Sequence, residues 1–186
     1  MTTKYIRIVG GSYRRTPIAV IDAPGLRPTP DRVRETLYNW LGHFWQGEFA
    51  DKRVLDLFAG TGALGLEAAS RGAREVLLVE TDRRAVAALR ALRQKLGAQA
   101  VRVHPGDALA ALRGAAGYDL VLLDPPFRQG WLERLWPLLP GALAPAGLVY
   151  AESEAPLAAP PGFTLLRQDK AGAVHYHLFQ FAASQN

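Results

Sequence analysis

The sequence predicts an α/β protein whose sheet is mostly parallel and is covered by helices on both faces. After residue 51, segments of strand length alternate with segments of helical periodicity along the 186-residue chain. The strand segments are apolar throughout, which is typical of parallel strands that are buried on both faces. The length fits one domain with a small extension, so we divide the chain into residues 1–50, a basic extension, and residues 51–186, the main domain.

The extension is predicted to contain a hairpin and a helix. Residues 5–9 and 16–21 have the composition of short strands and flank a pair of glycines. A turn-rich stretch at residues 24–28 follows, and we expect Thr29 to cap a helix whose first residue is Pro30. Apolar side chains then recur at helical spacing, at Val33, Leu37, Trp40, Leu41 and Phe44, while Arg32, Arg34 and Glu35 fall outside this apolar face.

The main domain shows the alternation most clearly. We expect strands at residues 53–58, 75–80, 101–104, 118–124 and 148–152, and helices at residues 63–71, 83–96 and 131–139. Residues 163–168 and 174–181 predict a terminal hairpin. Ligands of such sheets bind beyond the carboxyl ends of the strands, near the point where the strand order reverses. Acidic residues and glycines gather at these predicted strand ends, which places a candidate site there.

Composition narrows the function classes. The net charge of +5 and the pI of about 9.8 suit a polyanionic partner, although charge alone is equally compatible with a basic protein that has none. The absence of cysteine excludes disulfides, cysteine zinc sites and a thiolate nucleophile. The four histidines lack the spacing of a helical metal site, so we predict no metal. The chain shows neither a membrane-length apolar run nor a secretion signal, and we expect a cytoplasmic protein.

A glycine loop follows the first strand of the main domain. Residues 60–65 satisfy the G-x-G-x-x-G pattern between a predicted strand and a predicted helix, a context typical of nucleotide-derived cofactors. The pattern alone fits both a dinucleotide and S-adenosylmethionine. Asp56, just ahead of the glycines, would repel a pyrophosphate but favours the cationic S-adenosylmethionine.

Further acids fit an adenosine cofactor of this kind. Glu80 ends the second strand and is placed to accept hydrogen bonds from ribose hydroxyls. Asp107 is placed for the adenine amino group, although a helix N-cap explains it equally well. The predicted cofactor contacts are Asp56, Phe58, Ala59, Gly60, Thr61, Gly62, Glu80, Thr81, Asp107 and Ala108.

The tetrad Asp124-Pro125-Pro126-Phe127 ends the fourth strand and is the predicted catalytic motif. Proline also ends strands for purely structural reasons, but an acid, two prolines and an aromatic residue in this place form a more specific signal. Asp124 and a carbonyl of the rigid Pro-Pro turn can accept hydrogen bonds from an amino group and orient its lone pair. Phe127 offers a face on which a base stacks. Since no thiolate is available for pyrimidine C5 chemistry, an exocyclic amine is the expected target.

With these motifs, the sequence resembles the RsmD-like methyltransferases, which modify guanine N2 in 16S ribosomal RNA. The resemblance covers nearly the whole chain and is carried by residues 7–11, 25–29, 31–41, 56–68 and 124–127. The Arg-Pro-Thr to Asn-Trp-Leu segment, within residues 27–41, is the most specific of these stretches. The resemblance implies a class I methyltransferase fold, a Rossmann-like sheet of seven strands with a reversed last strand.

The resemblance also implies partners and RNA contacts. The substrate would be 16S ribosomal RNA in a 30S particle or an assembly intermediate, and we expect a monomer that binds no membrane. The N-terminal arm would contact RNA, with Asn39 near the site. Its candidate RNA-binding residues are Arg7, Arg14, Arg15, Arg27, Arg32 and Arg34.

Three other functions remain open on the residues alone. A nicotinamide oxidoreductase uses the same glycine pattern, although Asp56 and the tetrad argue against it. A non-catalytic RNA-binding assembly factor on this scaffold would not need the intact Asp124 and Phe127. An enzyme that methylates adenine N6 in DNA, or a glutamine amide, would share the chemistry, and such enzymes carry similar tetrads that usually begin with asparagine.

Overall fold

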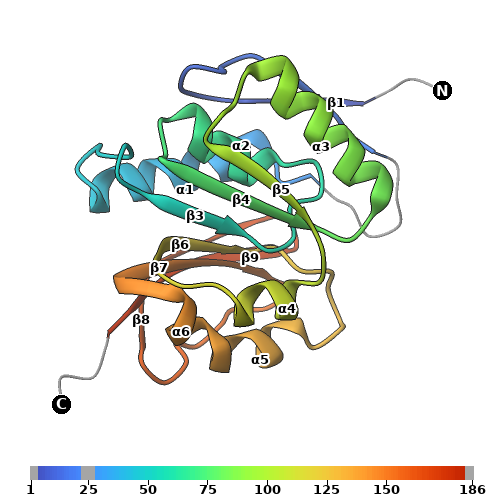
Figure 1. The fold of residues 1–186 in the computed structure, drawn as a ribbon. Helices are drawn as coiled ribbons and strands as arrows, with labels where there is room; N and C mark the ends of the chain where they lie inside the picture. The colour runs from blue at the N-terminus through green and yellow to red at the C-terminus, as the bar shows by residue number, and fades with distance from the viewer. Residues whose placement is uncertain (1–3, 22–27, 183–186) are drawn as a thin grey trace.

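A seven-stranded sheet forms the centre of the protein within residues 4–21 and 28–182, the part of the chain that the computed structural model describes (Figure 1). The strand order is β5-β4-β3-β6-β7-β9-β8. The strands are β3 (Arg53–Asp56), β4 (Glu75–Glu80), β5 (Val101–Pro105), β6 (Tyr118–Leu123), β7 (Leu143–Ser153), β8 (Phe163–Ala171) and β9 (Val174–Phe181). Only β9 runs antiparallel to its neighbours, which confirms the predicted α/β class and the reversed last strand.

Helices cover both faces of this sheet. Figure 1 shows α1 (Asp31–Phe44), α2 (Ala63–Ser70) and α3 (Arg83–Leu96) on one face. The other face carries α4 (Ala108–Arg113), α5 (Trp131–Leu135), the 3-10 turn η1 (Trp136–Leu138) and α6 (Leu139–Ala142). Successive strand residues point to opposite faces, so Val54 joins the apolar cluster under the first helix layer and Leu55 joins the one under the second. Burial on both faces explains why the strands are apolar throughout.

The N-terminal segment adds a small hairpin to the first layer. Strands β1 (Tyr5–Arg7) and β2 (Pro17–Ala19) pair antiparallel, as predicted, although both are shorter than expected. In Figure 1 the hairpin lies alongside α3. Ile8 and Ile18 are buried in the same core cluster as the sheet and α1, so the hairpin is packed on the domain.

One predicted helix is divided in the structure, and one predicted strand is longer than expected. The single helix expected at residues 131–139 is divided into α5, η1 and α6. Pro137 lies in η1 and Pro140 in α6, and a proline lacks the N–H that a continuous helix needs at that position. The strand expected at residues 148–152 is longer, because β7 begins at Leu143 and its central residues pair with both β6 and β9. Among the described residues, no helix combines the length and the apolar character that crossing a membrane requires.

Candidate active site

The candidate site lies where the strand order reverses. Strands β3 and β6 are neighbours, but the chain leaves β3 toward α2 on one face and leaves β6 toward α5 on the other. A crevice between diverging loops is the usual ligand site of an open α/β sheet. Asp56 ends β3, and Asp124 directly follows β6. The next strands on either side end in Glu80 and, one residue before the end of β7, Glu152.

Asp56 organises the glycine loop from below. The Asp56 Oδ2 accepts a hydrogen bond from the backbone N–H of Gly65 at 3.1 Å, and Oδ1 accepts one from Phe58 at 3.4 Å. The side chain is buried. Gly65 packs closely, because an added Cβ would lie 2.3 Å from a methyl carbon of Leu78, which would have to shift. Gly62 has φ +82° and would meet Leu89 at 2.5 Å, so the loop needs glycine there for both backbone and space.

Glu80 fixes the upper side of the same loop. The Glu80 Oε2 accepts from Gly60 N–H at 2.8 Å, while Oε1 accepts from the N–H groups of Thr81 and Asp82, both at 2.8 Å. A carboxylate oxygen has two lone pairs, so Oε2 retains one for a ligand hydroxyl. The predicted contacts of Phe58, Ala59, Gly60, Thr61 and Gly62 all lie between these two acids.

Asp107 caps α4. Its Oδ1 accepts from the Ala110 N–H at 3.0 Å, which confirms the N-cap interpretation of this residue. The side chain is exposed, so its second oxygen faces solvent. The predicted contact between Asp107 and an adenine amino group stays a prediction, as does that of the buried Ala108 that follows it.

A polar cluster holds the tetrad aspartate. The Thr29 hydroxyl lies 3.4 Å from Asp124 Oδ2 and 3.1 Å from Glu152 Oε1. The Tyr150 hydroxyl donates to the same Glu152 oxygen at 2.7 Å. Glu152, Tyr150 and Thr29 are buried, whereas Asp124 is half-buried and open on one side. Because one hydroxyl carries one proton, Thr29 can donate to only one of the two carboxyls at a time.

Burial and mutual repulsion raise the pKa of these acids. Desolvation, opposed by its two backbone hydrogen bonds and reinforced by Glu80 and Glu152, raises the pKa of Asp56 to about 7. Burial first, and then the neighbouring Glu152, raise the pKa of Asp124 well above its ordinary value. Burial also raises the pKa of Glu152. None of the ion pairs between described residues includes Asp56, Asp124 or Glu152. The site is therefore an acidic cluster without a cation of its own.

Aromatic rings line the loops on either side. Phe58, from the glycine loop, packs edge-on against Trp131 of α5 with ring centroids 5.2 Å apart. In the tetrad Pro125 is buried, Pro126 is exposed and Phe127 is half-buried. Arg128 pairs with Glu154 at 3.1 Å and so ties the loop after β6 to the loop after β7.

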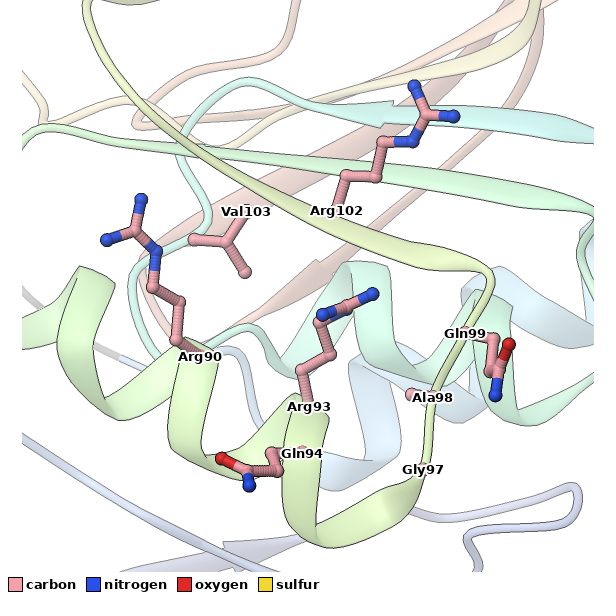
Figure 2. Close-up of a pocket in the computed structure, with 8 residues that line it drawn as sticks. All are labelled: Arg90, Arg93, Gln94, Gly97, Ala98, Gln99, Arg102 and Val103. Atoms are coloured by element: carbon pink, nitrogen blue, oxygen red, sulfur yellow. The ribbon is translucent and has the colours of Figure 1, made fainter.

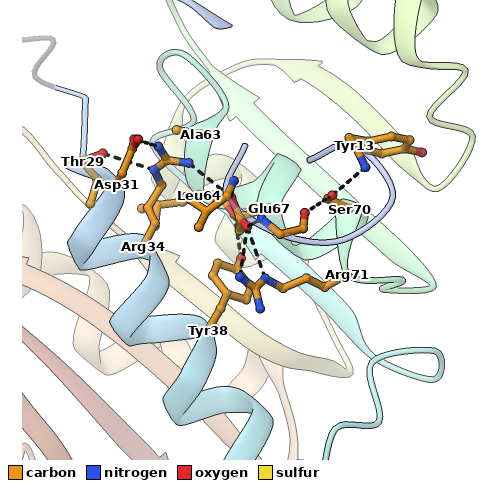
Figure 3. A network of polar contacts seen from close by, with 12 residues as sticks. Tyr13, Thr29, Asp31, Arg34, Tyr38, Ala63, Leu64, Glu67, Ser70 and Arg71 are labelled. Atoms are coloured by element: carbon orange, nitrogen blue, oxygen red, sulfur yellow. Dashed lines mark hydrogen bonds and ion pairs between the residues drawn. The ribbon is translucent and has the colours of Figure 1, made fainter. Parts of the chain in front are cut away.

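Figure 3 shows a second network, centred on Glu67 of α2, that joins the N-terminal segment to the site. Glu67 accepts from the N–H groups of Val9 at 2.9 Å and Gly10 at 2.7 Å. It also receives Arg34 Nη1 and Arg71 Nε, each at 3.2 Å. Arg34 in turn donates to the Thr29 carbonyl at 3.2 Å. The hairpin, α1 and the helix of the glycine loop are thus held by one buried carboxylate.

Two predictions for this segment are corrected. Arg34 was expected to contact RNA, but its side chain is fully buried and pairs with Glu67 and Asp31. A buried arginine needs such partners, so Arg34 holds the fold instead. Thr29 was expected to cap α1, but the N-cap position is Pro30 and no side chain caps the helix. The Thr29 hydroxyl contacts Asp124 and Glu152 instead.

The other predicted RNA-binding arginines are placed differently. Arg7, Arg14, Arg15 and Arg32 are exposed, as is Asn39. Arg27 lies outside the described residues. Arg7 lines a groove of about 540 Å³ between the hairpin, α3 and the glycine loop, where Gly60, Thr61 and Lys95 also contribute. The hairpin therefore lies next to the glycine loop.

Sequence reasoning missed three site residues: Thr29, Tyr150 and Glu152. Glu152 lies near the carboxyl end of its strand, the same signal that identified Glu80 and Asp124, so the pattern was sufficient to find it. Thr29 gave no such signal, because its contact with Asp124 spans 95 residues of sequence.

Comparison with known proteins agrees with this architecture. Residues 6–180 match a family model described as Conserved hypothetical protein 95. Ribosomal RNA small subunit methyltransferase D of Escherichia coli strain K12 is 44% identical over 181 residues, covering 94% of this chain and 89% of the relative. The protein of the same name from Haemophilus influenzae is 37% identical, covering 94% and 93%.

Solved structures share the fold over almost the whole chain. The structure of yhhF from Escherichia coli, described as a putative methyltransferase, has a TM-score of 0.86 at 43% identity and covers 97% of this chain and 100% of that chain. A methylase structure from Haemophilus influenzae has a TM-score of 0.79 at 33% identity, with the same coverage. Sheet order, glycine loop and acidic edge thus define a class I methyltransferase. Within that class, the chain belongs to the ribosomal RNA small subunit methyltransferase D family.

Proposed function

We propose that this protein transfers a methyl group from S-adenosylmethionine to the exocyclic N2 of a guanine in 16S ribosomal RNA. The observation that carries the proposal is Asp124, half-buried at the switch point beside the end of β3 and in contact with the Thr29 hydroxyl. The relatives named as small subunit ribosomal RNA methyltransferases support the choice of RNA. The choice of guanine N2 rests on the family resemblance and on the tetrad chemistry.

The residues present fit a cationic methyl donor. Asp56, Glu80, Asp124 and Glu152 gather at one edge without an ion-paired cation among the described residues, and a positively charged ligand relieves their repulsion. A dinucleotide pyrophosphate would increase that repulsion. S-adenosylmethionine, when bound, supplies a methyl group on a positively charged sulfur, which is a good electrophile. Glu80 Oε2 and the second oxygen of Asp107 are the acceptors available for its hydroxyl and amino groups.

The tetrad positions the target amine. Asp124 and a backbone carbonyl of the Pro125-Pro126 turn each accept a hydrogen bond from the amino group, which directs its lone pair along the line of transfer. Phe127 supplies the stacking face for the base, worth about 1–3 kcal/mol. Thr29 and Glu152 fix the Asp124 carboxyl from behind. After transfer the nitrogen loses a proton, either to Asp124 or directly to water.

The exposed arginines of the N-terminal segment supply the affinity for RNA. Arg7, Arg14, Arg15 and Arg32 are free to contact phosphates, and arginine does so with two parallel hydrogen bonds. Glu67 holds this segment against α2, so its position relative to the glycine loop is fixed before RNA binds. The RNA is presented in a 30S particle or an assembly intermediate.

Two substitutions of Asp124 test the mechanism. Methyl transfer from labelled S-adenosylmethionine is measured on an unmodified 16S transcript and on 30S particles that lack the modification. We expect Asp124→Ala to lower kcat by at least about 100-fold, because the amine loses the acceptor that positions it. Asp124→Asn retains a carbonyl acceptor, so we expect it to keep more activity than the alanine variant if Asp124 only positions the amine.

The matched control is Asp51→Ala, which removes an exposed acid outside the site. Full activity of Asp124→Ala on either substrate would remove the assigned role. Equal inactivity of the alanine and asparagine variants would instead assign Asp124 as the proton acceptor. Transfer to adenine rather than guanine would move the proposal to the related amine target.

A further inference from the structure

Helix α3 is strongly basic and carries no acidic residue. Its 14 residues include five cations, Arg83, Arg84, Arg90, Arg93 and Lys95, all of them exposed. Of these, only Arg84 takes part in an ion pair between described residues, a loose one with Asp82 at 3.8 Å. A solvent-facing helix usually gains stability from acid–base pairs three or four residues apart. This helix contains none, and Arg90 and Arg93 place like charges at that spacing.

Helix stability does not account for this distribution. Cations favour the last turn of a helix, which explains Arg93 and Lys95, but they oppose the dipole in the first turn, where Arg83 and Arg84 lie. Arg90 lies in the middle of the helix and has no partner in the ion pairs between described residues. The charges therefore suit a partner outside the chain better than they suit the helix.

The second half of the helix borders a hollow on the surface of the protein. Its volume is about 680 Å³, and it lies between α3 and the edge strand β5 rather than beside the acidic cluster. Figure 2 shows Arg90 and Arg93 rising from α3 toward β5, while Arg102 extends from the strand on its other side. Gln94 and Gln99 add amide donors and acceptors along the rim. The lining contains no acidic side chain.

We propose that the exposed face of α3, together with the edge strand β5, is a second RNA-binding surface that contacts the phosphate backbone. This surface, defined by Arg83, Arg90, Arg93, Arg102, Gln94 and Gln99, rests on the proposed function for its choice of polyanion. Its position is independent of the N-terminal arm. Arginine and glutamine side chains without acids are the composition that phosphate and ribose contacts require.

The surface is connected to the active site by the helix itself. Helix α3 begins three residues after Glu80, at the carboxyl edge of the sheet, and 14 residues at 1.5 Å each extend about 21 Å away from it. RNA whose target base enters the site can therefore lie along α3 and reach β5. The hairpin on the other side of α3 holds Arg7 beside Lys95, so the helix separates two basic grooves.

The test measures binding of an unmodified 16S transcript as a function of salt concentration. The variants are Arg90→Gln and the double variant Arg90→Gln/Arg102→Gln, neither of which touches the acidic cluster. Arg113→Gln is the control, because it removes one exposed arginine from α4, which lies outside this surface. Arg93 is left unchanged, because its Nε donates to the Val101 carbonyl at 2.5 Å and supports the fold.

The logarithm of the binding constant falls as the logarithm of the salt concentration rises, and we expect each lost phosphate contact to make this slope shallower by about 0.7–0.9. This weakens binding at 0.1 M salt, relative to 1 M, by about fivefold to eightfold for each contact. The KM for RNA should rise in parallel while kcat stays constant. Arg113→Gln should change neither the slope nor the KM.

Three results decide the proposal. Unchanged affinity and slope in the double variant would overturn it, and so would equal losses in Arg113→Gln, which would show a general effect of net charge. Loss of binding confined to the α3 and β5 variants supports it. This comparison uses binding alone, so a wild-type protein that binds RNA but transfers no methyl group would refute the proposed function and leave the surface to be judged on its own.

Discussion

Glu152 is predicted to control the ionisation of Asp124, and Glu152→Gln tests this most cleanly. Both carboxyls contact the Thr29 hydroxyl, so the nearest oxygen atoms lie at most about 6.5 Å apart. A like charge at that distance, with an effective dielectric constant of about 20, costs about 2.5 kcal/mol. Asp124 is partly open to water, and this screening reduces the cost of the repulsion.

The sign follows from the cause. A neighbouring negative charge favours the protonated form and raises the pKa of Asp124, and its removal therefore lowers that pKa. Glutamine can still accept from Thr29 and Tyr150, so the cluster keeps its shape. If the ionised Asp124 is the acceptor for the amine, the acid limb of the kcat/KM profile moves to lower pH.

The direct assay is a carboxyl ¹³C NMR titration of the free protein with labelled aspartate. We expect the Asp124 resonance to titrate at lower pH in Glu152→Gln than in the wild type, because the repulsion that raises its pKa is removed. The control is Glu154→Gln, which removes an exposed acid two residues further on that pairs with Arg128. An Asp124 titration that is the same in all three proteins would refute the electrostatic coupling.

The fold makes three further predictions. Glu67→Gln removes the negative charge of one of the two acidic partners of buried Arg34 and replaces one of the two acceptor oxygens of the network with an NH2 group, so urea unfolding should show a loss of about 3–5 kcal/mol; a loss below about 1 kcal/mol would contradict the buried network. Gly65→Ala should lose about 1–3 kcal/mol of stability through overpacking. Gly42→Ala, in α1, places its Cβ where no atom lies within 4 Å and should gain up to about 1 kcal/mol of stability. Equal shifts of the melting temperature in the two variants would contradict the close contact at Gly65. The folded pKa of Asp56, about 7, lies above its unfolded value, so its contribution to stability is complete below about pH 4 and is lost as the pH rises to about 7, by up to about 4 kcal/mol. The free energy of unfolding of the wild type should therefore fall across this pH range more steeply than that of Asp56→Asn. Parallel pH dependences of the two proteins would contradict the raised pKa.

The sequence was sufficient for those parts of the fold that local pattern determines. Apolar strands and a terminal hairpin predicted the sheet, because a strand that is buried on both faces is apolar along its whole length. The glycine loop and the acids at the strand ends followed from the same logic, since parallel strands present their carboxyl ends at one edge. The helix predicted at 131–139 is divided in the structure, because the prolines at 137 and 140 interrupt a segment whose apolar residues have helical spacing.

Long-range contacts were beyond local pattern. Arg34 has the spacing of an exposed helix residue, and only the fold reveals that Glu67 of α2 lies opposite it and makes its burial favourable. Thr29 matches the N-cap preference, but its hydroxyl contacts the half-buried Asp124 and the buried Glu152 instead. Thr29 was assigned to its own helix and Arg34 to RNA, whereas in the structure each contacts a carboxylate from an element far away in sequence.

The most direct test of the central claim is the identity of the methylated nucleoside. Unmodified 16S ribosomal RNA, as a transcript and within 30S particles, is incubated with the protein and S-adenosylmethionine, digested to nucleosides and analysed by mass spectrometry against methylated standards. We predict that the wild type forms N2-methylguanosine at a single position and that Asp124→Ala forms none. Methylation at a ring carbon or a ribose oxygen, or no methylation by a protein shown to bind the cofactor, would contradict it.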